Sequence, residues 1–209
     1  MEALQIERLV LGSVQTNCYY LYRKGHTEAV CIDPADRGAD LYAALKEQGL
    51  SVQGILLTHG HFDHILGVKQ LRDLAGCKVY AYEGEQELLA DATMNVSAQM
   101  SHPVSIEADI LLRDSERVTI ADMTCTVIAT PGHTAGSCCY YYEAEGVLFS
   151  GDTLFQESVG RTDFPTGSSA ALGRSLREKL MILPENVKVY PGHGDETTIG
   201  YEARYNPYC

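Results

Sequence analysis

Basic residues are scarce in this chain of 209 residues: 16 Lys and Arg stand against 28 Asp and Glu, a formal net charge of −12. Proteins that bind nucleic acid usually carry a basic surface that displaces phosphate counterions, so we expect no nucleic-acid partner. No segment approaches the ~18 consecutive apolar residues of a membrane span, so we expect no association with a membrane. The first residues lack the basic and apolar regions of a signal peptide, which predicts a cytoplasmic protein.

The sequence also lacks a Cys-x-x-Cys pair, and its seven cysteines are an odd number. Most of them lie within apolar runs that are typical of strands, where a free thiol behaves as a small hydrophobic group. Without a signal peptide, this pattern predicts reduced cysteines in a reducing compartment.

Apolar runs that predict strands alternate with helical periods along the chain. Hydrophobic residues make up 45% of the sequence and no linker or repeat divides it, so we expect one domain over residues 1–209. Each half runs through strands and then a helix, which predicts an α/β (α+β) fold with two packed sheets between outer helices, an αββα sandwich. The expected strands are 6–12, 17–22, 29–33, 52–57, 78–82, 117–120, 124–129, 137–142, 147–150 and 187–190, and the expected helices are 39–49, 65–74, 85–90, 169–180 and 199–205.

One turn concentrates groups that bind metals. His59, His61, Asp63 and His64 lie between the expected strand 52–57 and the expected helix 65–74. Imidazole suits zinc, and a carboxylate adds negative charge and oxygen ligands. Residues i and i+2 of an extended turn point the same way, so His59 and His61 can share one ion while Asp63 and His64 face a second. We also expect Asp63 to be the N-cap of the helix that follows.

Four further polar residues end other predicted strands at turns that contain glycine or proline, namely Asp33, His133, Asp152 and His193. Five of the seven histidines of the chain therefore lie at such turns. Strand ends at one rim of a sheet converge, so these separate loops can build one site. Asp33 precedes Pro34, and two interpretations are equally open for it: a residue that forms the turn, or a carboxylate that orients a ligand histidine.

Residues 91–107 show no periodicity and contain Met94, Met100 and His102. Irregular segments of this length in compact enzymes often form lids, so we expect this loop to cover the metal site and to influence substrate choice. A surface loop without that role is the alternative. We expect His102 to be a loop residue rather than a ligand.

The combination of motifs closely resembles the metallo-β-lactamase superfamily. The matching segments are the turn at 59–64, His133 in Thr-Pro-Gly-His-Thr, Asp152 in Gly-Asp-Thr-Leu-Phe and His193 in Tyr-Pro-Gly-His-Gly. Within the superfamily the chain looks most like the small bacterial glyoxalase II-like hydrolases, which residues 160–164 and 206–208 also fit. The resemblance implies an αββα sandwich with the metals at one edge of the two sheets.

The resemblance also implies a set of ligands for two divalent ions. One ion would be held by His59, His61 and His133, the other by Asp63, His64 and His193, and Asp152 would bridge the two. Three residues would support the ligands from behind or beside them: Asp33, Thr134 and Thr153. Zinc is the expected metal, with iron and manganese as alternatives, because all three accept imidazole and carboxylate ligands.

Two divalent ions about 3.5–4 Å apart share a water and lower its pKa. The implied reaction is therefore attack of a metal-bridging hydroxide on a carbonyl, with Asp63 and Asp152 as the catalytic carboxylates. A thiol of pKa ~8.5 leaves readily, so a small-molecule thioester of the hydroxyacylglutathione type suits the site, although an ester or a lactone would also react. The thioester itself follows from the resemblance alone. No thiol of the chain needs a catalytic role.

The main alternative is a persulfide dioxygenase of the same superfamily, an oxidoreductase with one iron held by two His and one Asp, which shares the motif at 160–164. Asp63, His64 and His193 together favour two metals and hydrolysis. A β-lactamase is less expected, because the chain shows no export signal and Asp152 stands at the bridging position. A tRNA-processing nuclease is less expected because of the acidic net charge. We expect Arg161 and Asp163 to form a structural ion pair.

Overall fold

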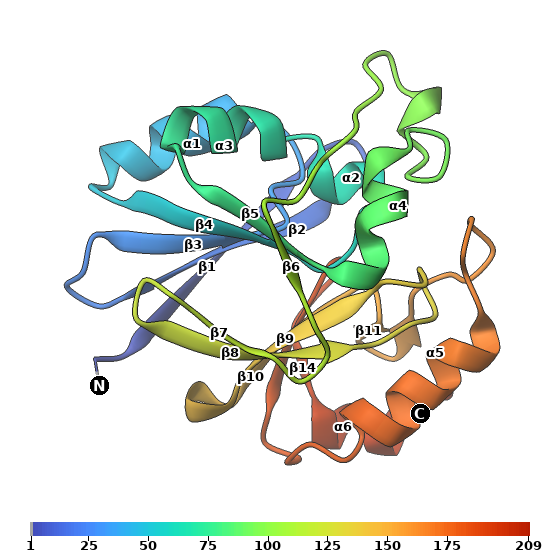
Figure 1. The fold of residues 1–209 in the computed structure, drawn as a ribbon. Helices are drawn as coiled ribbons and strands as arrows, with labels where there is room; N and C mark the ends of the chain where they lie inside the picture. The colour runs from blue at the N-terminus through green and yellow to red at the C-terminus, as the bar shows by residue number, and fades with distance from the viewer. Residues whose placement is uncertain (1) are drawn as a thin grey trace.

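Two six-stranded sheets face each other in the computed structural model, which describes residues 2–209 (Figure 1). The first sheet has the order β1-β2-β3-β4-β5-β6, with β1 Leu4–Leu11, β2 Thr16–Arg23, β3 Glu28–Ile32, β4 Ser51–Leu57, β5 Lys78–Tyr82 and β6 Ile110–Leu112. The second has the order β14-β13-β10-β9-β8-β7, with β7 Arg117–Ile120, β8 Met123–Ala129, β9 Cys138–Tyr142, β10 Val147–Gly151, β13 Lys188–Pro191 and β14 Thr197–Thr198. A small hairpin joins β11 Leu154–Phe155 to β12 Ser158–Val159.

Helices lie on the outer faces of both sheets. The helices are α1 Gly38–Glu47, α2 Phe62–Ile65, α3 Val68–Ala75, α4 Gln86–Ala90, α5 Ser169–Ser175, which continues as a π-helical turn over Leu176–Leu180, and α6 Ile199–Tyr205. α1 and α3 cover the first sheet, whereas α5 and α6 cover the second (Figure 1). This arrangement confirms the predicted αββα fold.

Three apolar layers hold the four structural layers together. Leu41 and Leu71 pack with Ile55 between the first sheet and its helices. Tyr19, Leu21 and Phe149 belong to the layer between the two sheets. A third cluster joins the second sheet to α5 and α6, with Leu172, Leu176 and Ile199 among its buried members. This packing fixes the positions of both sheets. The turns at their shared edge therefore also have defined positions.

The expected helix 65–74 is two helices in the structure. α2 begins at Phe62, and the helix is interrupted around Gly67 before α3 starts at Val68. A Cβ atom at Gly67 would lie 2.6 Å from the carbonyl oxygen of Pro34, and the Gly67 amide donates to that oxygen at 2.9 Å. The break therefore lets the segment after β3 pass close to the helices and bring Asp33 beside the metal turn.

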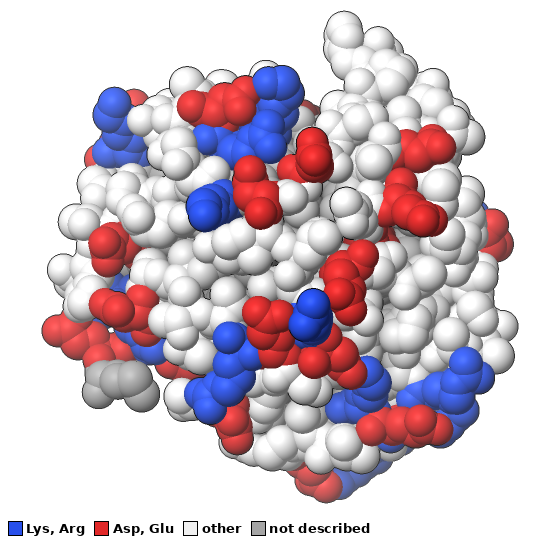
Figure 2. All heavy atoms as spheres, in the orientation of Figure 1, with Lys and Arg blue, Asp and Glu red and all other residues white. Residues whose placement is uncertain are grey.

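Acidic and basic side chains are interspersed on the face of the molecule that Figure 2 shows. Among residues 2–209, the helices are all too short or too polar to cross a membrane.

Candidate metal centre

The turn after β4 presents its imidazoles inward. His61 occupies the N-cap position of α2 with an extended backbone, so the expectation that Asp63 caps this helix is wrong. Asp63 lies in the first turn of α2, where its carboxylate accepts a hydrogen bond from the Thr16 hydroxyl at 2.7 Å. The same oxygen lies 3.2 Å from His193 Nε2, so the carboxylate turns towards the candidate site rather than towards the backbone of its own helix.

Glycines let the loops that carry Asp152 and His193 approach this turn closely. A Cβ atom at Gly192 would lie 2.2 Å from Asp152 Oδ1. Gly151 has a φ of +49°, and a Cβ atom there would lie 2.3 Å from Thr58 Oγ1. These two contacts explain in physical terms why glycine adjoins both candidate ligands.

His59, His61 and His133 form the first of three groups whose candidate ligand atoms lie within 4.8 Å of one another. All three side chains are buried, with 1–2% of each residue exposed. His133 Nε2 lies 2.8 Å from His61 Nδ1 and 3.2 Å from His59 Nε2. We call these residues the tri-histidine cluster.

Asp63, His64 and His193 form another of the three groups, which we call the mixed cluster, and His59, His64 and Asp152 form the remaining one. Asp152 lies between the two clusters. Its Oδ1 is 3.3 Å from His64 Nε2, and its Oδ2 is 3.6 Å from His133 Nε2 and 3.5 Å from His193 Nε2. The structure thus brings together all seven residues that the sequence suggests as metal ligands.

Burial makes protonation unfavourable for two members of the tri-histidine cluster, His59 and His61. Burial, followed by the imidazoles of His64 and His133, holds the pKa of His59 well below its usual value. Burial and His133 lower the pKa of His61 to about 3. Both imidazoles are therefore neutral at physiological pH, which is the form that binds a metal.

Carboxylates reverse this balance in the mixed cluster. Burial alone would lower the pKa of His64, but Asp63, Asp152 and Asp33 raise it well above its usual value. Burial would likewise raise the pKa of Asp63, but His64 and hydrogen bonds from His193 and Thr16 hold it well below its usual range. Anionic carboxylates thus attract positive charge to this cluster, from a proton or from a metal ion.

The geometry fits divalent ions. Three buried polar atoms have no hydrogen-bond partner within residues 2–209 and belong to the candidate ligands: His61 Nε2, His64 Nε2 and Asp152 Oδ1. A buried polar atom without a partner is costly, and coordination removes that cost. Ligands held ~2.1 Å from a tetrahedral ion lie about 3.4 Å apart. The distances of 3.2–3.6 Å from Asp63 to His193 and from Asp152 to His64, His133 and His193 match this spacing.

Asp33 contacts the mixed cluster from behind. Its Oδ2 lies 2.9 Å from His64 Nδ1 and accepts a hydrogen bond from the Thr58 hydroxyl at 2.6 Å, while Oδ1 accepts one from the Thr58 amide at 2.8 Å. Asp33 also has a left-handed backbone, with φ of +49°. The two interpretations that the sequence leaves open therefore coexist, because the strained turn aims the carboxylate at His64.

Thr134 and Thr153 do not make the predicted side-chain hydrogen bonds to ligands. The Thr134 hydroxyl donates to Glu85 at 2.9 Å, and the Thr153 hydroxyl pairs with Thr130 at 2.8 Å. Each threonine directly follows a candidate ligand within a turn. Their side chains therefore brace the loops rather than the imidazole or the carboxylate.

Several contacts at the site have no local signal in the sequence. His133 Nδ1 lies 2.7 Å from the carbonyl oxygen of Arg161, a main-chain contact that residue types do not reveal. The guanidinium of Arg161 lies 3.9 Å from the centre of the Phe164 ring and forms the expected ion pair with Asp163 at 2.7 Å. Phe164 in turn makes an edge contact with His61, with ring centres 5.3 Å apart. These residues border the tri-histidine cluster.

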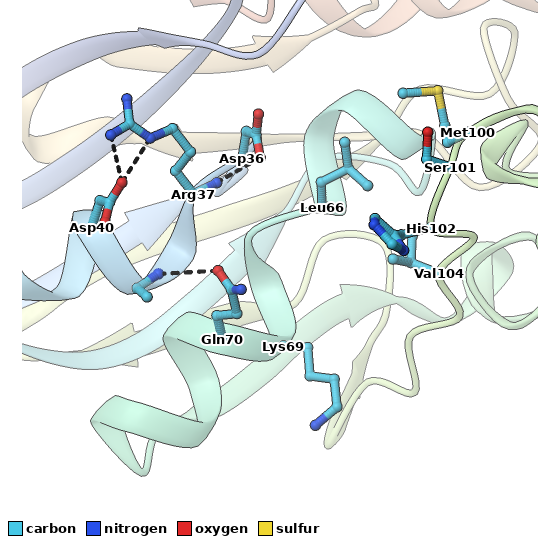
Figure 3. Close-up of a pocket in the computed structure, with 11 residues that line it drawn as sticks. Asp36, Arg37, Asp40, Leu66, Lys69, Gln70, Met100, Ser101, His102 and Val104 are labelled. Carbon is cyan, nitrogen blue, oxygen red and sulfur yellow. Dashed lines mark hydrogen bonds and ion pairs between the residues drawn. The ribbon is translucent and has the colours of Figure 1, made fainter.

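The loop 91–107 is anchored beside the site but also faces the outer layer. The Asn95 carbonyl oxygen accepts a hydrogen bond from the Phe62 amide at 2.9 Å, directly after His61. Further along, Met100, Ser101 and His102 line a hollow of about 620 Å³ together with residues around α1 and α3 (Figure 3). His102 is thus a loop residue apart from the clustered histidines, as expected, and the lid role of the loop stays a prediction.

Comparisons with known proteins agree with this geometry. The family model described as metallo-beta-lactamase superfamily matches residues 11–193. The crystal structure of BLEG-1 B3 metallo-beta-lactamase is similar, with 42% identity, a TM-score of 0.92 and coverage of 98% of this chain and 99% of that chain. The structure of TTHA1623 in a di-iron-bound form is 34% identical, with a TM-score of 0.86 and coverage of 97% and 100%. Hydroxyacylglutathione hydrolase GloC of Haemophilus influenzae is 31% identical, covering 98% of both chains.

Proposed function

We propose that this chain, which belongs to the metallo-β-lactamase superfamily, is a hydrolase that uses two divalent metal ions. The observation that carries this proposal is the position of Asp152. Its Oδ1 faces His64 in the mixed cluster, and its Oδ2 faces both His193 in the mixed cluster and His133 in the tri-histidine cluster. A single carboxylate in reach of both clusters is the arrangement that a two-ion site needs.

The proposed ligand set follows the two clusters. The first ion would be held by His59, His61 and His133, the second by Asp63, His64 and His193, and Asp152 would be available to both. Imidazole and carboxylate donors accept zinc, iron or manganese. Zinc is our proposal for the metal, while the di-iron-bound form of TTHA1623 supports iron as the alternative.

Bound divalent ions supply a water of lowered pKa and positive charge beside a substrate carbonyl. Asp63 lies at the accessible side, with 14% of its side chain exposed, and its anionic carboxylate would orient the attacking water. The Thr16 hydroxyl holds this carboxylate in position. Phe155, which makes an edge contact with His193 at 5.9 Å between ring centres, provides an apolar wall that excludes other water.

The proposed substrate is a small-molecule thioester of the hydroxyacylglutathione type, and the proposed location is the cytoplasm. The similarity to GloC of Haemophilus influenzae supports this substrate class. Thioester cleavage also needs little acid catalysis, because a thiol of pKa ~8.5 leaves as the thiolate.

Hydrolysis of a β-lactam is the second candidate, because BLEG-1, named as a B3 metallo-beta-lactamase, is 42% identical. An amide leaving group needs a proton at nitrogen, which a thiolate does not. His193, half-buried beside Asp63, is the one histidine of the two clusters that solvent reaches appreciably.

The test combines metal analysis with a panel of substrates. The protein is freed of metal, reconstituted separately with zinc, iron and manganese, and assayed against a hydroxyacyl glutathione thioester, a lactone and a β-lactam. We expect two ions per chain and the highest kcat/KM for the thioester. The metal-free protein serves as the control for each substrate.

A stoichiometry of one ion per chain would contradict the two-ion proposal. With iron, it would favour the alternative of a mononuclear persulfide dioxygenase, which oxygen consumption with a glutathione persulfide would reveal. Two ions with a preference for the β-lactam would keep the metal centre and replace the substrate.

A further inference from the structure

A buried carboxylate outside the candidate ligands connects two of their loops. Glu85 ends the 3₁₀ turn Glu83–Glu85 between β5 and α4, and only 2% of it is exposed. Its Oε1 accepts a hydrogen bond from the Gly60 amide at 2.8 Å, and its Oε2 accepts one from the Thr134 hydroxyl at 2.9 Å. Each carboxylate oxygen therefore holds a different loop.

These two loops carry every member of the tri-histidine cluster. Gly60 lies between His59 and His61, and Thr134 directly follows His133. The distance between the two loops sets the separation of His61 from His133, whose nearest nitrogens are 2.8 Å apart. The Glu85 side chain links the two loops from the side opposite the site. Its length and rigidity therefore influence the positions of all three histidines together.

The surroundings of Glu85 are built for close approach. A Cβ atom at Gly136 would lie 2.3 Å from the Glu85 amide nitrogen, and one at Gly60 would lie 2.8 Å from Leu89. The Thr134 hydroxyl is also fixed, because it lies 2.7 Å from Ser137 Oγ. These contacts fix the positions of the two loops from which the donors reach Glu85.

Glu85 has no Lys, Arg or His in ion-pair contact among residues 2–209. Burial raises the pKa of Glu85 to about 7, against the opposing effect of hydrogen bonds from Gly60, Thr134 and Gly136. A carboxyl group without a cationic partner is costly to bury. The hydrogen bonds that its two oxygens accept offset part of this cost.

We propose that Glu85 is a positioning residue that sets the affinity of the tri-histidine cluster for its metal ion. Asp33 contacts the other cluster directly at His64 and reaches the tri-histidine cluster only through the Thr58 hydroxyl, which lies 3.2 Å from His59 Nδ1. This inference rests on the proposed metal centre, but it concerns binding at one cluster and not the identity of the substrate.

Glu85→Ala removes both acceptors, whereas Glu85→Gln keeps one oxygen for Gly60 and offers an amide N–H to Thr134 Oγ1. Thr134→Ala cuts only one link, and Thr134→Ser keeps the hydroxyl and should restore the wild-type behaviour. Glu202→Ala is the matched control, because Glu202 is equally buried but its hydrogen bonds go to Thr197, Glu157 and Asn206.

Binding of Co²⁺ to the metal-free protein, followed by its visible absorption and by competition with a chelator, measures the affinities. Supporting residues of metal ligands are typically worth about 10–100-fold in affinity. We expect a loss of this size for one of the two ions in Glu85→Ala, a smaller loss in Glu85→Gln and Thr134→Ala, and none in Thr134→Ser or Glu202→Ala.

Double variants identify the affected cluster. In a His193→Ala background, where the tri-histidine cluster is the principal site, Glu85→Ala should still weaken binding of Co²⁺ by 10–100-fold. In a His133→Ala background it should have no further effect. Equal losses at both clusters, unchanged affinities, or a loss that Glu202→Ala reproduces would each overturn the proposal. If Glu85→Ala does not fold, Thr134→Ala and Thr134→Ser decide it alone.

This outcome is separable from the proposed function. A protein that hydrolyses none of the substrates would refute the function, while the affinity of the tri-histidine cluster for Co²⁺ would still report on Glu85.

Discussion

The two clusters of candidate ligands differ in exposure and in charge. The tri-histidine cluster is closed, because no more than 2% of His59, His61 or His133 is exposed. In the mixed cluster, 28% of the His193 side chain and 14% of the Asp63 side chain are exposed. Burial lowers the pKa of His59 and His61 in the first, whereas carboxylates raise the pKa of His64 in the second.

The difference suggests a division of work within one site. A closed cluster of neutral imidazoles holds an ion firmly but offers little access, so it suits anchoring and polarisation. An open cluster with its own carboxylate has room for substrate and a group that can take up a proton. Asp152 faces both clusters, so its substitution is the strongest test of the proposed difference between them.

Asp152→Ala should have the largest effect. It removes the one carboxylate that faces both clusters, so activity should fall by more than the ~100-fold that supporting residues reach. Asp152 belongs to none of the three apolar layers, so the fold should persist. Steady-state assays and circular dichroism measure the two effects, and an unfolded variant would show that the site carries the stability.

Asp33→Ala should lower metal affinity or turnover by about 10–100-fold, because His64 loses the acceptor that orients it. The larger loss should fall on the ion of the mixed cluster, because Asp33 contacts His64 directly and His59 only through Thr58, in contrast to the loss expected for Glu85→Ala. Asp33→Asn, which keeps an acceptor for Thr58, separates the turn from the orientation of His64. Unchanged affinity and turnover in both variants would leave Asp33 as a turn residue alone.

His133→Ala and His193→Ala should differ in stability although both remove a ligand. In the metal-free protein, loss of buried His133 leaves a cavity and frees the Arg161 carbonyl oxygen, at a cost of about 1–3 kcal/mol. His193 is half-buried, so its replacement by alanine should lower the free energy of unfolding by about 0.5–1 kcal/mol. Urea unfolding of the two variants measures the difference, and equal losses would contradict the description of one cluster as closed and the other as open.

The sequence predicts the parts of this protein that depend on periodicity and strand ends. The αββα fold and the convergence of His133, Asp152 and His193 follow from alternating patterns and from polar residues placed after apolar runs. What it cannot supply is the direction of individual side chains. Asp63 is of a residue type typical of N-caps, but its side chain turns to Thr16 and His193. Thr134 points away from the ligand beside it.

Long-range partners are hidden for a related reason. Glu85 lies in an acidic run that is typical of an exposed helix start, and only the packed structure shows that Gly60 and Thr134 converge on it. The break between α2 and α3 depends likewise on the approach of Pro34 to Gly67. Both contacts join residues more than 20 positions apart, so no local pattern contains them.

The smallest expected effect concerns the loop 91–107, which is attached through Phe62 to the turn that serves both clusters. Asn95 and Ser97 fix its base, since the side chains of both bind the Val104 carbonyl oxygen at 3.0 Å. Removing residues 99–102 and closing the gap with glycine keeps this base intact. If the loop covers the open side, the shortened enzyme should keep both ions while KM changes several-fold and differently for each thioester.

His102→Ala is the control for that deletion, because it removes a side chain that lines the hollow in Figure 3 without shortening the loop. A lid acts through its reach over the site, so the deletion should change substrate preference and the control should not. Equal changes in both variants would place the effect in the hollow between the loop and the outer helices. Should the shortened enzyme treat every thioester as the wild type does, substrate choice must lie elsewhere. Residues 160–167, which adjoin His133 through Arg161, would then be the next segment to exchange.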